Sequence, residues 1–166
     1  MILALDVYYS VNEASSVGVL FNWKDSTSLQ TVRARIENVE EYIPGEFYRR
    51  ELPCLLKVID KIKLSSLEAI LVDGYVYVDD NFKLGLGGRL WEALNKKIPV
   101  IGVAKTSFHS NKKTVKEIFR GKSKNPLYVS CIGMDMEEAA EKIQGMSGNF
   151  RMPSILKHLD IMTKEV

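Results

Sequence analysis

The chain has 166 residues, of which 46% are hydrophobic and 27% are charged, and its formal net charge is +2. This length predicts one domain over residues 1–166 with a substantial core, and the composition is ordinary for a soluble globular protein. No apolar run approaches the roughly 20 residues that span a bilayer, and the first residues lack the features of a signal peptide. We therefore expect a cytoplasmic, monomeric protein with no membrane partner, in which Cys54 and Cys131 are small core residues.

Three segments near the N-terminus are predicted to be β-strands, because apolar or alternating runs are separated by turn residues. They cover residues 2–9, 16–23 and 29–37, and the short connections favour an antiparallel meander. After them, Pro53 fits the first turn of a helix but not its interior. A helix is therefore expected to begin near Leu52, which would leave Glu51 at its N-terminus.

The rest of the chain alternates predicted strands with predicted helices. Strands are expected over residues 69–73, 99–103 and 127–131, and helices over residues 88–96, 136–144 and 153–161. Three strands in meander followed by alternating strands and helices is the element order of an α/β ribonuclease-H-like fold with a mixed sheet. In such a fold the first strand lies beside the strand that follows the first helix. Asp6 and Asp73 are therefore expected to be neighbours.

Asp6 and Asp73 each follow a short apolar run, where ligands of open α/β sheets gather. Together with Glu51 they would suit a hard cation such as Mg²⁺, with Mn²⁺ as a possible substitute. Such a cation can activate water and neutralise a phosphate during phosphodiester hydrolysis. Lys105 follows another predicted strand, where it could bind the phosphate or steady the departing oxygen. Taken singly, each aspartate could instead be a turn or cap residue, and Lys105 simply an exposed strand end.

The positive charge is concentrated in one part of the chain. Residues 96–124 contain nine basic residues and one acid, a net charge of +8. Most such segments are solvated surface, but this one would also suit a phosphate backbone. The residues that we expect to contact phosphate are Lys112, Lys113, Lys116 and Arg120.

The loop Tyr42-Ile43-Pro44-Gly45 combines turn residues with two bulky apolar side chains. Apolar side chains inserted between base steps unstack nucleic acid, so Tyr42, Ile43 and Pro44 are predicted to form a wedge. The alternative is a loop whose tyrosine and isoleucine fold back on the core.

Taken together, these segments resemble the endonuclease V family. The matching segments are Asp6-Val7, Tyr42 to Gly45 followed by Arg50-Glu51, Val72-Asp73-Gly74, Ile101 to Lys105, Tyr128-Val129-Ser130, and Arg151-x-Pro153. The resemblance implies a Mg²⁺-dependent endonuclease that nicks DNA or RNA containing deaminated adenine. The expected cut is at the second phosphodiester bond 3′ to deoxyinosine or inosine.

The resemblance also implies roles for individual residues. Asp6, Glu51 and Asp73 would hold metal, and Lys105 would contact phosphate. Residues 42–44 would form the wedge, and the pocket for the flipped base would lie beside Gly85, Gly87 and Gly88, because glycine permits close approach of a ligand.

Three positions depart from the family pattern. Glu41 replaces a proline, and residues 78–83 replace a His-Pro-Arg segment with one residue more. Met134 stands where the family has a metal-site histidine, and methionine is a poor ligand for Mg²⁺. Nearby carboxylates do not obviously compensate: we expect Asp79 and Asp80 in a turn and Asp135 as a helix N-cap.

Three other functions were weighed against these residues. The first is a degenerate family member that binds nucleic acid without cutting it, because of Met134. The second is a different ribonuclease-H-like nuclease, such as a structure-specific resolvase, against which the wedge sequence argues. The third is a sugar kinase or ATPase on the related fold. It is set aside because Asp6 is followed by Val7-Tyr8-Tyr9-Ser10 and not by a Gly-containing phosphate loop.

Overall fold

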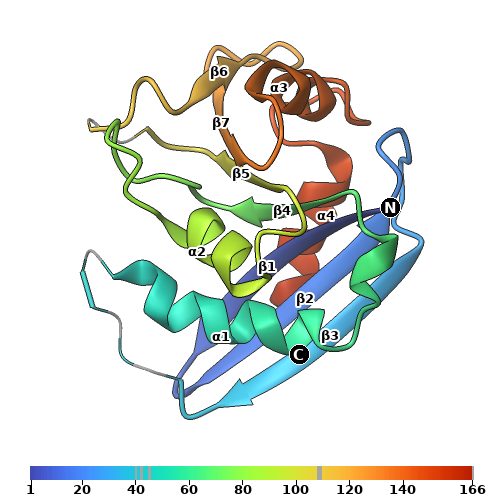
Figure 1. Cartoon of the computed structure of the whole chain (residues 1–166). Helices are drawn as coiled ribbons and strands as arrows, with labels where there is room; N and C mark the ends of the chain where they lie inside the picture. Colours follow the sequence, from blue (N-terminus) through green and yellow to red (C-terminus); the bar gives the residue numbers. More distant parts are fainter. Residues whose placement is uncertain (40, 42, 45, 108–109, 166) are drawn as a thin grey trace.

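A seven-stranded mixed sheet with helices on both faces forms the protein (Figure 1). The structure, a computed structural model, describes residues 1–39, 41, 43–44, 46–107 and 110–165. The strands are β1 (Ile2–Ser10), β2 (Glu13–Phe21), β3 (Gln30–Glu37), β4 (Ala69–Asp73), β5 (Val100–Ala104), β6 (Lys116–Ile118) and β7 (Leu127–Ile132). The helices are α1 (Phe47–Ile59), α2 (Leu86–Ala93), α3 (Met136–Gln144) and α4 (Ser154–Thr163), with a 3₁₀ turn, η1, at Leu64–Ser66. In the described part of the chain no helix is long and apolar enough to cross a membrane.

The sheet has the strand order β3-β2-β1-β4-β5-β7-β6, which confirms the predicted ribonuclease-H-like arrangement. Strands β1, β2 and β3 form the antiparallel meander, and β4 and β5 continue the sheet in parallel with β1. Leu5 pairs with Val72, so the next residues, Asp6 and Asp73, lie at the same level on adjacent strands. The expected proximity of these two aspartates is confirmed.

Two hydrophobic layers hold the sheet, because side chains alternate between its faces along each strand. On one face, Leu3, Leu5, Ile70 and Val72 pack with residues of α1 and α2. On the other face, residues such as Ile2, Ala4, Leu71 and Val103 pack with residues of α3 and α4. Figure 1 shows α1 and α2 on the near side of the sheet and α4 on the far side. Cys54 and Cys131 are buried, unpaired core residues, as predicted.

The start of α1 differs from the prediction. The helix begins at Phe47 and carries Pro53 in its interior. An interior proline removes one backbone donor and typically costs about 3 kcal/mol, but the turns that follow bury Leu55, Val58 and Ile59 against the sheet. Glu51 is therefore in the second turn of α1 and not at its N-terminus, which turns its side chain toward the ends of the strands.

Other differences lie at the ends of elements. Helix α2 starts at Leu86, two residues before the predicted position, and the three-residue strand β6 was not predicted. Both depend on contacts with distant parts of the chain: β6 exists because Ile118 and Lys116 pair with Leu127 and Val129 of β7.

Gly102 lies in the middle of β5, where its missing side chain allows close packing. A Cβ there would lie 2.5 Å from the Gly74 carbonyl oxygen and 2.8 Å from Ser130 Oγ. Ser130 Oγ in turn accepts the Val76 amide at 3.0 Å, so the strain would spread into the loop after β4.

We predict that Gly102→Ala destabilises the fold by about 2 kcal/mol and lowers Tm by about 4–8 °C. The matched control is Gly145→Ala, because Gly145 has φ −82° and its Cβ would come no closer than 3.3 Å to Glu141 O and 3.9 Å to Lys142 O. Thermal unfolding followed by circular dichroism tests the pair. Equal melting temperatures for the two variants would contradict the prediction.

Candidate active site

A cleft of about 260 Å³ opens where β4 and β5 end, beside the middle of β1 and against α4. Its polar lining includes Asp6, Asp73, Lys105 and Asp160, and its wall includes the apolar residues Met152, Leu156 and Leu159. Asp6 is not at the end of its strand, because β1 continues to Ser10 beside β2. It reaches the cleft because the shorter β4 stops at Asp73.

The alternation of side chains explains why three of the predicted residues meet. Asp6 has the same parity as Ile2 and Ala4, which face α3 and α4. Asp73 follows Ala69 and Leu71 on that face, and Lys105 follows Ile101 and Val103. The cleft therefore collects one residue from each of three adjacent strands. Glu51 approaches from α1, in the opposite layer, and comes within electrostatic reach of both aspartates.

The carboxylates raise one another's pKa. Burial, followed by the charges of Asp73 and Asp160, raises the pKa of Asp6 to about 7, while the Val7 amide and Lys105 oppose the shift. Burial, with the charges of Asp73 and Asp6, raises the pKa of Glu51 to about 8. The cleft lining holds three carboxylates, Asp6, Asp73 and Asp160, against two lysines, Lys105 and Lys157.

Asp73 belongs to the same electrostatic group, although it is more open to solvent than Asp6 or Glu51. Burial by the surrounding protein raises its pKa; Lys105 lowers it and Asp160 raises it. Lys105 itself is exposed at the end of β5, and its ammonium is the positive charge that acts on both aspartates.

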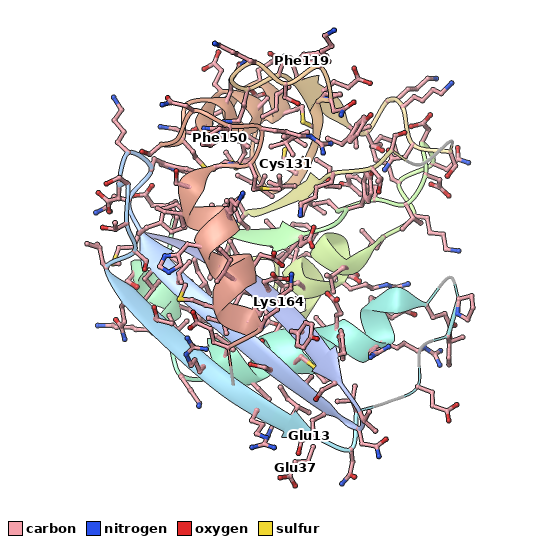
Figure 2. The ribbon with its side chains drawn as sticks, turned by 180° about the vertical axis from the view of Figure 1, so that it is seen from behind. Glu13, Glu37, Phe119, Cys131, Phe150 and Lys164 are labelled. Carbon is pink, nitrogen blue, oxygen red and sulfur yellow. The ribbon has the colours of Figure 1, made fainter. Side chains whose placement is uncertain are left out.

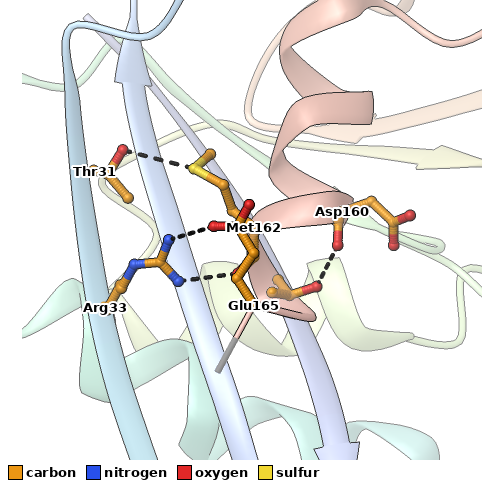
Figure 3. Close-up of polar contacts among 6 residues, drawn as sticks. Thr31, Arg33, Asp160, Met162 and Glu165 are labelled. Atoms are coloured by element: carbon orange, nitrogen blue, oxygen red, sulfur yellow. Dashed lines mark hydrogen bonds and ion pairs between the residues drawn. The ribbon is translucent and has the colours of Figure 1, made fainter.

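Asp160 is a cleft carboxylate that the sequence analysis missed. It lies on α4, one helical turn after Leu156, which also lines the cleft. The C-terminal end of α4 is anchored to β3: Arg33 donates to the Met162 carbonyl at 2.9 Å and pairs with Glu165 at 3.5 Å (Figure 3). An acid at helical spacing beside an apolar stripe was the only available signal, and it does not distinguish a cleft residue from a surface residue.

The predicted wedge lies only partly within the described residues. Tyr42 is outside them; Ile43 is 45% exposed and Pro44 is also exposed. The exposure of Ile43 agrees with a loop that presents its apolar residue to solvent. A role of residues 42–44 in separating strands stays a prediction.

The start of α2 contains three buried glycines, Gly85, Gly87 and Gly88. They allow the helix to pack closely against the segment that follows β4. A Cβ on Gly87 would lie 2.9 Å from Val76, and one on Gly88 would lie 2.8 Å from the Val76 carbonyl oxygen. These glycines are explained by helix packing, and the base pocket beside them stays a prediction.

The prediction that Arg120 contacts phosphate is wrong. Its side chain is 5% exposed, and its guanidinium donates to backbone carbonyls, which leaves it unavailable to a phosphate. The accepting residues are Gln144, Met146, Gly148, Phe150 and Arg151. Among the other candidates, Lys112 and Lys113 are exposed, whereas Lys116 pairs with Glu137.

The remaining acidic candidates have structural roles. The carboxylate of Asp79 accepts the amides of Asn81 and Lys83, and that of Asp80 accepts the amides of Lys112 and Lys113. Asp135 accepts the Glu138 amide at 3.1 Å as the N-cap of α3.

Met134 packs against the hydrophobic core and is not part of the cleft lining. Whether a metal can be held therefore depends on Asp6, Glu51, Asp73 and Asp160, and not on the side chain at position 134.

The donor set of the cleft suits a hard divalent cation, because all its anionic groups are carboxylates and they are short of positive charge. Within the described residues, no three Asp, Glu, His or Cys side chains converge closely enough to form a complete cage. Mg²⁺ does not need one, since it usually keeps several waters and takes one or two carboxylates.

The mixed sheet, its strand order and a carboxylate-lined cleft at the strand ends define a ribonuclease-H-like protein. The sequence profile of the endonuclease V family matches residues 1–161. The chain therefore belongs to the endonuclease V family, a family of nucleases.

Relatives and solved structures agree with this assignment. Endonuclease V of Dehalococcoides mccartyi is 26% identical over 190 residues, covering 100% of this chain and 82% of the relative. A similar solved structure is that of Ciona intestinalis endonuclease V in complex with a 24mer DNA containing an inosine followed by a ribo-adenosine. Its TM-score is 0.84 at 19% identity, and the match covers 98% of this chain and 83% of that chain. Endonuclease V of Streptomyces avermitilis has a TM-score of 0.75 at 21% identity, with coverage of 98% and 79%. At these identities, the structures establish the fold.

The raised pKa of Glu51 predicts a pH-dependent cost to stability. At about pH 4.5 the carboxyl is neutral in the folded state and only half ionised in the unfolded state, so the penalty is small. At about pH 9 it is charged in both states and the folded state bears the full burial penalty. Stability is therefore lost as the pH rises from about 4.5 to about 8. In chelator, Glu51→Gln should raise the stability at about pH 9 by about 1–2 kcal/mol, with little gain at about pH 4.5.

The control is Glu117→Gln, because Glu117 is exposed on β6. Chemical denaturation of both variants at the two pH values measures the difference. A gain for Glu51→Gln that is the same at both values would show that the burial penalty is not electrostatic.

Proposed function

We propose that this protein is a divalent-metal-dependent endonuclease that nicks nucleic acid at the second phosphodiester bond 3′ to deoxyinosine or inosine. Its biological role would be repair of deaminated adenine, with Mg²⁺ as the cofactor and Mn²⁺ as a possible substitute. The observation that carries the proposal is the meeting of Asp6, Asp73, Lys105 and Asp160 in one cleft, with Glu51 coupled to it electrostatically. Family membership and the inosine-containing DNA of the Ciona structure support the substrate.

In this proposal Asp6 and Asp73 are the principal ligands, with Glu51 and Asp160 completing the anionic surroundings. Their mutual repulsion, visible in the raised pKa values of Asp6 and Glu51, is the electrostatic reason that a cation would bind here. When bound, the cation supplies charge neutralisation for the phosphate and lowers the pKa of a coordinated water.

The other cleft residues orient the scissile phosphate. The Lys105 ammonium, which lines the cleft with Asp6 and Asp73, would contact a nonbridging or departing oxygen of that phosphate. The exit of β5 is braced by Arg151, which donates through Nη2 to the Lys105 carbonyl and through Nε to the Pro126 carbonyl. The apolar wall of Met152, Leu156 and Leu159 limits the water that reaches the site.

Arg50 is a second cation beside the site. Its guanidinium carbon lies 3.7 Å from the centre of the Tyr9 ring, and its Nε is buried with no partner among the described residues. The aromatic face fixes the guanidinium, whose charge acts on the Glu51 carboxyl and lowers its pKa against the effect of burial.

We predict that the protein nicks a labelled strand one nucleotide beyond a single inosine, and that Asp73→Asn abolishes the nick. Lys105→Met should slow cleavage by about 10²–10³-fold, because it removes one charged donor from the developing negative charge. Asp160→Asn should also slow it, since that carboxylate acts on both Asp6 and Asp73.

Asp135→Asn is the matched control, because the N-cap of α3 is retained by asparagine and lies outside the cleft lining. Gel electrophoresis of the products with Mg²⁺ or Mn²⁺ measures both position and rate. Selective binding of inosine strands without any cut would instead support the non-cleaving alternative, and neither binding nor cutting would contradict both.

Metal binding should depend on pH, because protons compete with the cation. Asp6 and Glu51 hold protons at about pH 6 and lose them through about 7 and 8. We expect the affinity for Mn²⁺ to rise at least about tenfold between about pH 6 and pH 8, with release of protons.

Titration calorimetry in buffers of different ionisation enthalpy measures both the affinity and the released protons. The Glu51→Gln variant should lose the part of the pH dependence that extends toward pH 8. Affinity that is constant over this range would rule out these carboxylates as the titrating ligands.

A further inference from the structure

Two phenylalanines are exposed on neighbouring loops at the β6 side of the molecule. Phe119 is 52% exposed and Phe150 is 74% exposed. Figure 2 labels both in the upper part of the molecule, above α4. One exposed apolar residue is ordinary, but two large exposed rings on adjoining loops are not.

The two loops are joined by a buried arginine. Arg120 follows Phe119 directly, and its Nη1 donates to the Phe150 carbonyl at 2.6 Å. Its Nη2 donates to the carbonyls of Met146 at 2.5 Å and Gly148 at 3.1 Å. In addition, Gln144 Nε2 donates to the Phe119 carbonyl at 3.1 Å. The backbone beneath both rings is therefore fixed by side-chain hydrogen bonds.

Gly121 brings the loops into direct contact. It has φ +59°, and a Cβ there would collide with the Asn149 carbonyl oxygen and lie 3.4 Å from the Phe150 Cα. Burial of the Arg120 charge is unfavourable, and two exposed loops do not need such close packing in order to form. The arrangement is explained if the positions of the two rings matter for function.

Phe150 is close in the chain to the wall of the candidate active site. Met152 lines the cleft and is two residues after Phe150, so their Cα atoms are no more than about 7 Å apart. Arg151, between them, donates to the carbonyls of Lys105 and Pro126. A strand that leaves the cleft on this side would therefore reach the loop of Phe150, which Arg120 joins to the loop of Phe119.

Two exposed lysines follow Phe119 in the chain. Lys122 and Lys124 are exposed in the turn after Arg120, and Glu117 is the one acid between residues 116 and 124. An aromatic surface with adjacent lysines is the usual composition of a site for single-stranded nucleic acid: bases stack on the rings and ammonium groups contact the phosphates.

We propose that Phe119, Phe150, Lys122 and Lys124 form a stacking platform for unpaired nucleotides that flank the lesion in the substrate strand. The proposal rests on the proposed function, because it assumes that the cleft binds that strand. The platform would increase affinity without sequence preference, since every base has a face that can stack.

The experiment measures binding of labelled single strands that carry one inosine and a tail of increasing length on the 5′ or the 3′ side. Fluorescence anisotropy in chelator reports affinity without cleavage. For the wild-type protein, affinity should rise over the first few nucleotides of one tail. Phe119→Ala and Phe150→Ala should each lose about tenfold in affinity for the long strand and almost nothing for the short one.

Two further substitutions separate stacking from simple apolar contact. Phe150→Trp should keep the affinity, and its indole fluorescence should be quenched by the bound strand. Phe150→Leu should lose affinity as the alanine variant does, although leucine is apolar. Lys122→Gln with Lys124→Gln should reduce the slope of log affinity against log salt by about 1–2.

Leu29→Ala is the matched control, because Leu29 is 61% exposed in the turn between β2 and β3. Its affinity should equal that of the wild-type protein at every tail length. Melting temperatures within about 2 °C of the wild type would show that the exposed substitutions leave the fold intact.

The outcomes separate this proposal from the proposed function. If inosine strands bind but the phenylalanine variants match the wild type at every length, the platform is overturned while the nuclease proposal stands. If inosine strands do not bind the wild-type protein, both proposals fall. If Phe119→Ala and Phe150→Ala lose self-association in gel filtration and keep their affinity for the long strand, the two rings belong to an interface between copies of the chain. The platform is then overturned.

Discussion

The parallel pairing of β1 with β4 places Asp6 beside Asp73, and much of the molecule compensates for that juxtaposition. Two carboxylates at the same level on adjacent strands repel one another, and Asp160 and Glu51 add to the repulsion. The hydrophobic layers on both faces of the sheet are what hold these strands together against it. Uncompensated charge at one point lowers the stability of the fold unless a cation binds there.

The central strands could be predicted because the apolar runs that form them are visible in the local sequence. Residues 69–73 are apolar up to a single aspartate, and they form β4 with those bounds. The proximity of Asp6, Asp73 and Lys105 followed from strand order and from the shared edge at which these strands end. The start of α1 could not be predicted the same way, since the burial of Leu55, Val58 and Ile59 outweighs the local preference of Pro53.

The sequence shows where basic residues are concentrated, but it does not show whether each side chain points to solvent or into the protein. Arg120 belongs to a basic segment, yet its side chain turns inward to hold carbonyls of residues 144–151. Lys112 and Lys113, in the same segment, remain exposed. The difference arises from the packing of α3 and the chain after it, which is tertiary information. Asp160 was missed for the same reason, because only the docking of α4 brings it to Asp6 and Asp73.

The docking of α4 therefore controls the electrostatics of the site from a distance. Arg33, on β3 near the edge of the sheet, donates to the Met162 carbonyl at the end of α4, and the helix end carries partial negative charge that the guanidinium offsets. At the last residue of the helix, Thr163 Oγ1 donates to the Asp160 carbonyl at 2.6 Å, which tightens the helix end around the residue that lines the cleft. A shift of α4 along the sheet would move the Asp160 charge relative to Asp6. Arg33, on the far side of β2, thus helps to fix the end of the helix that carries Asp160.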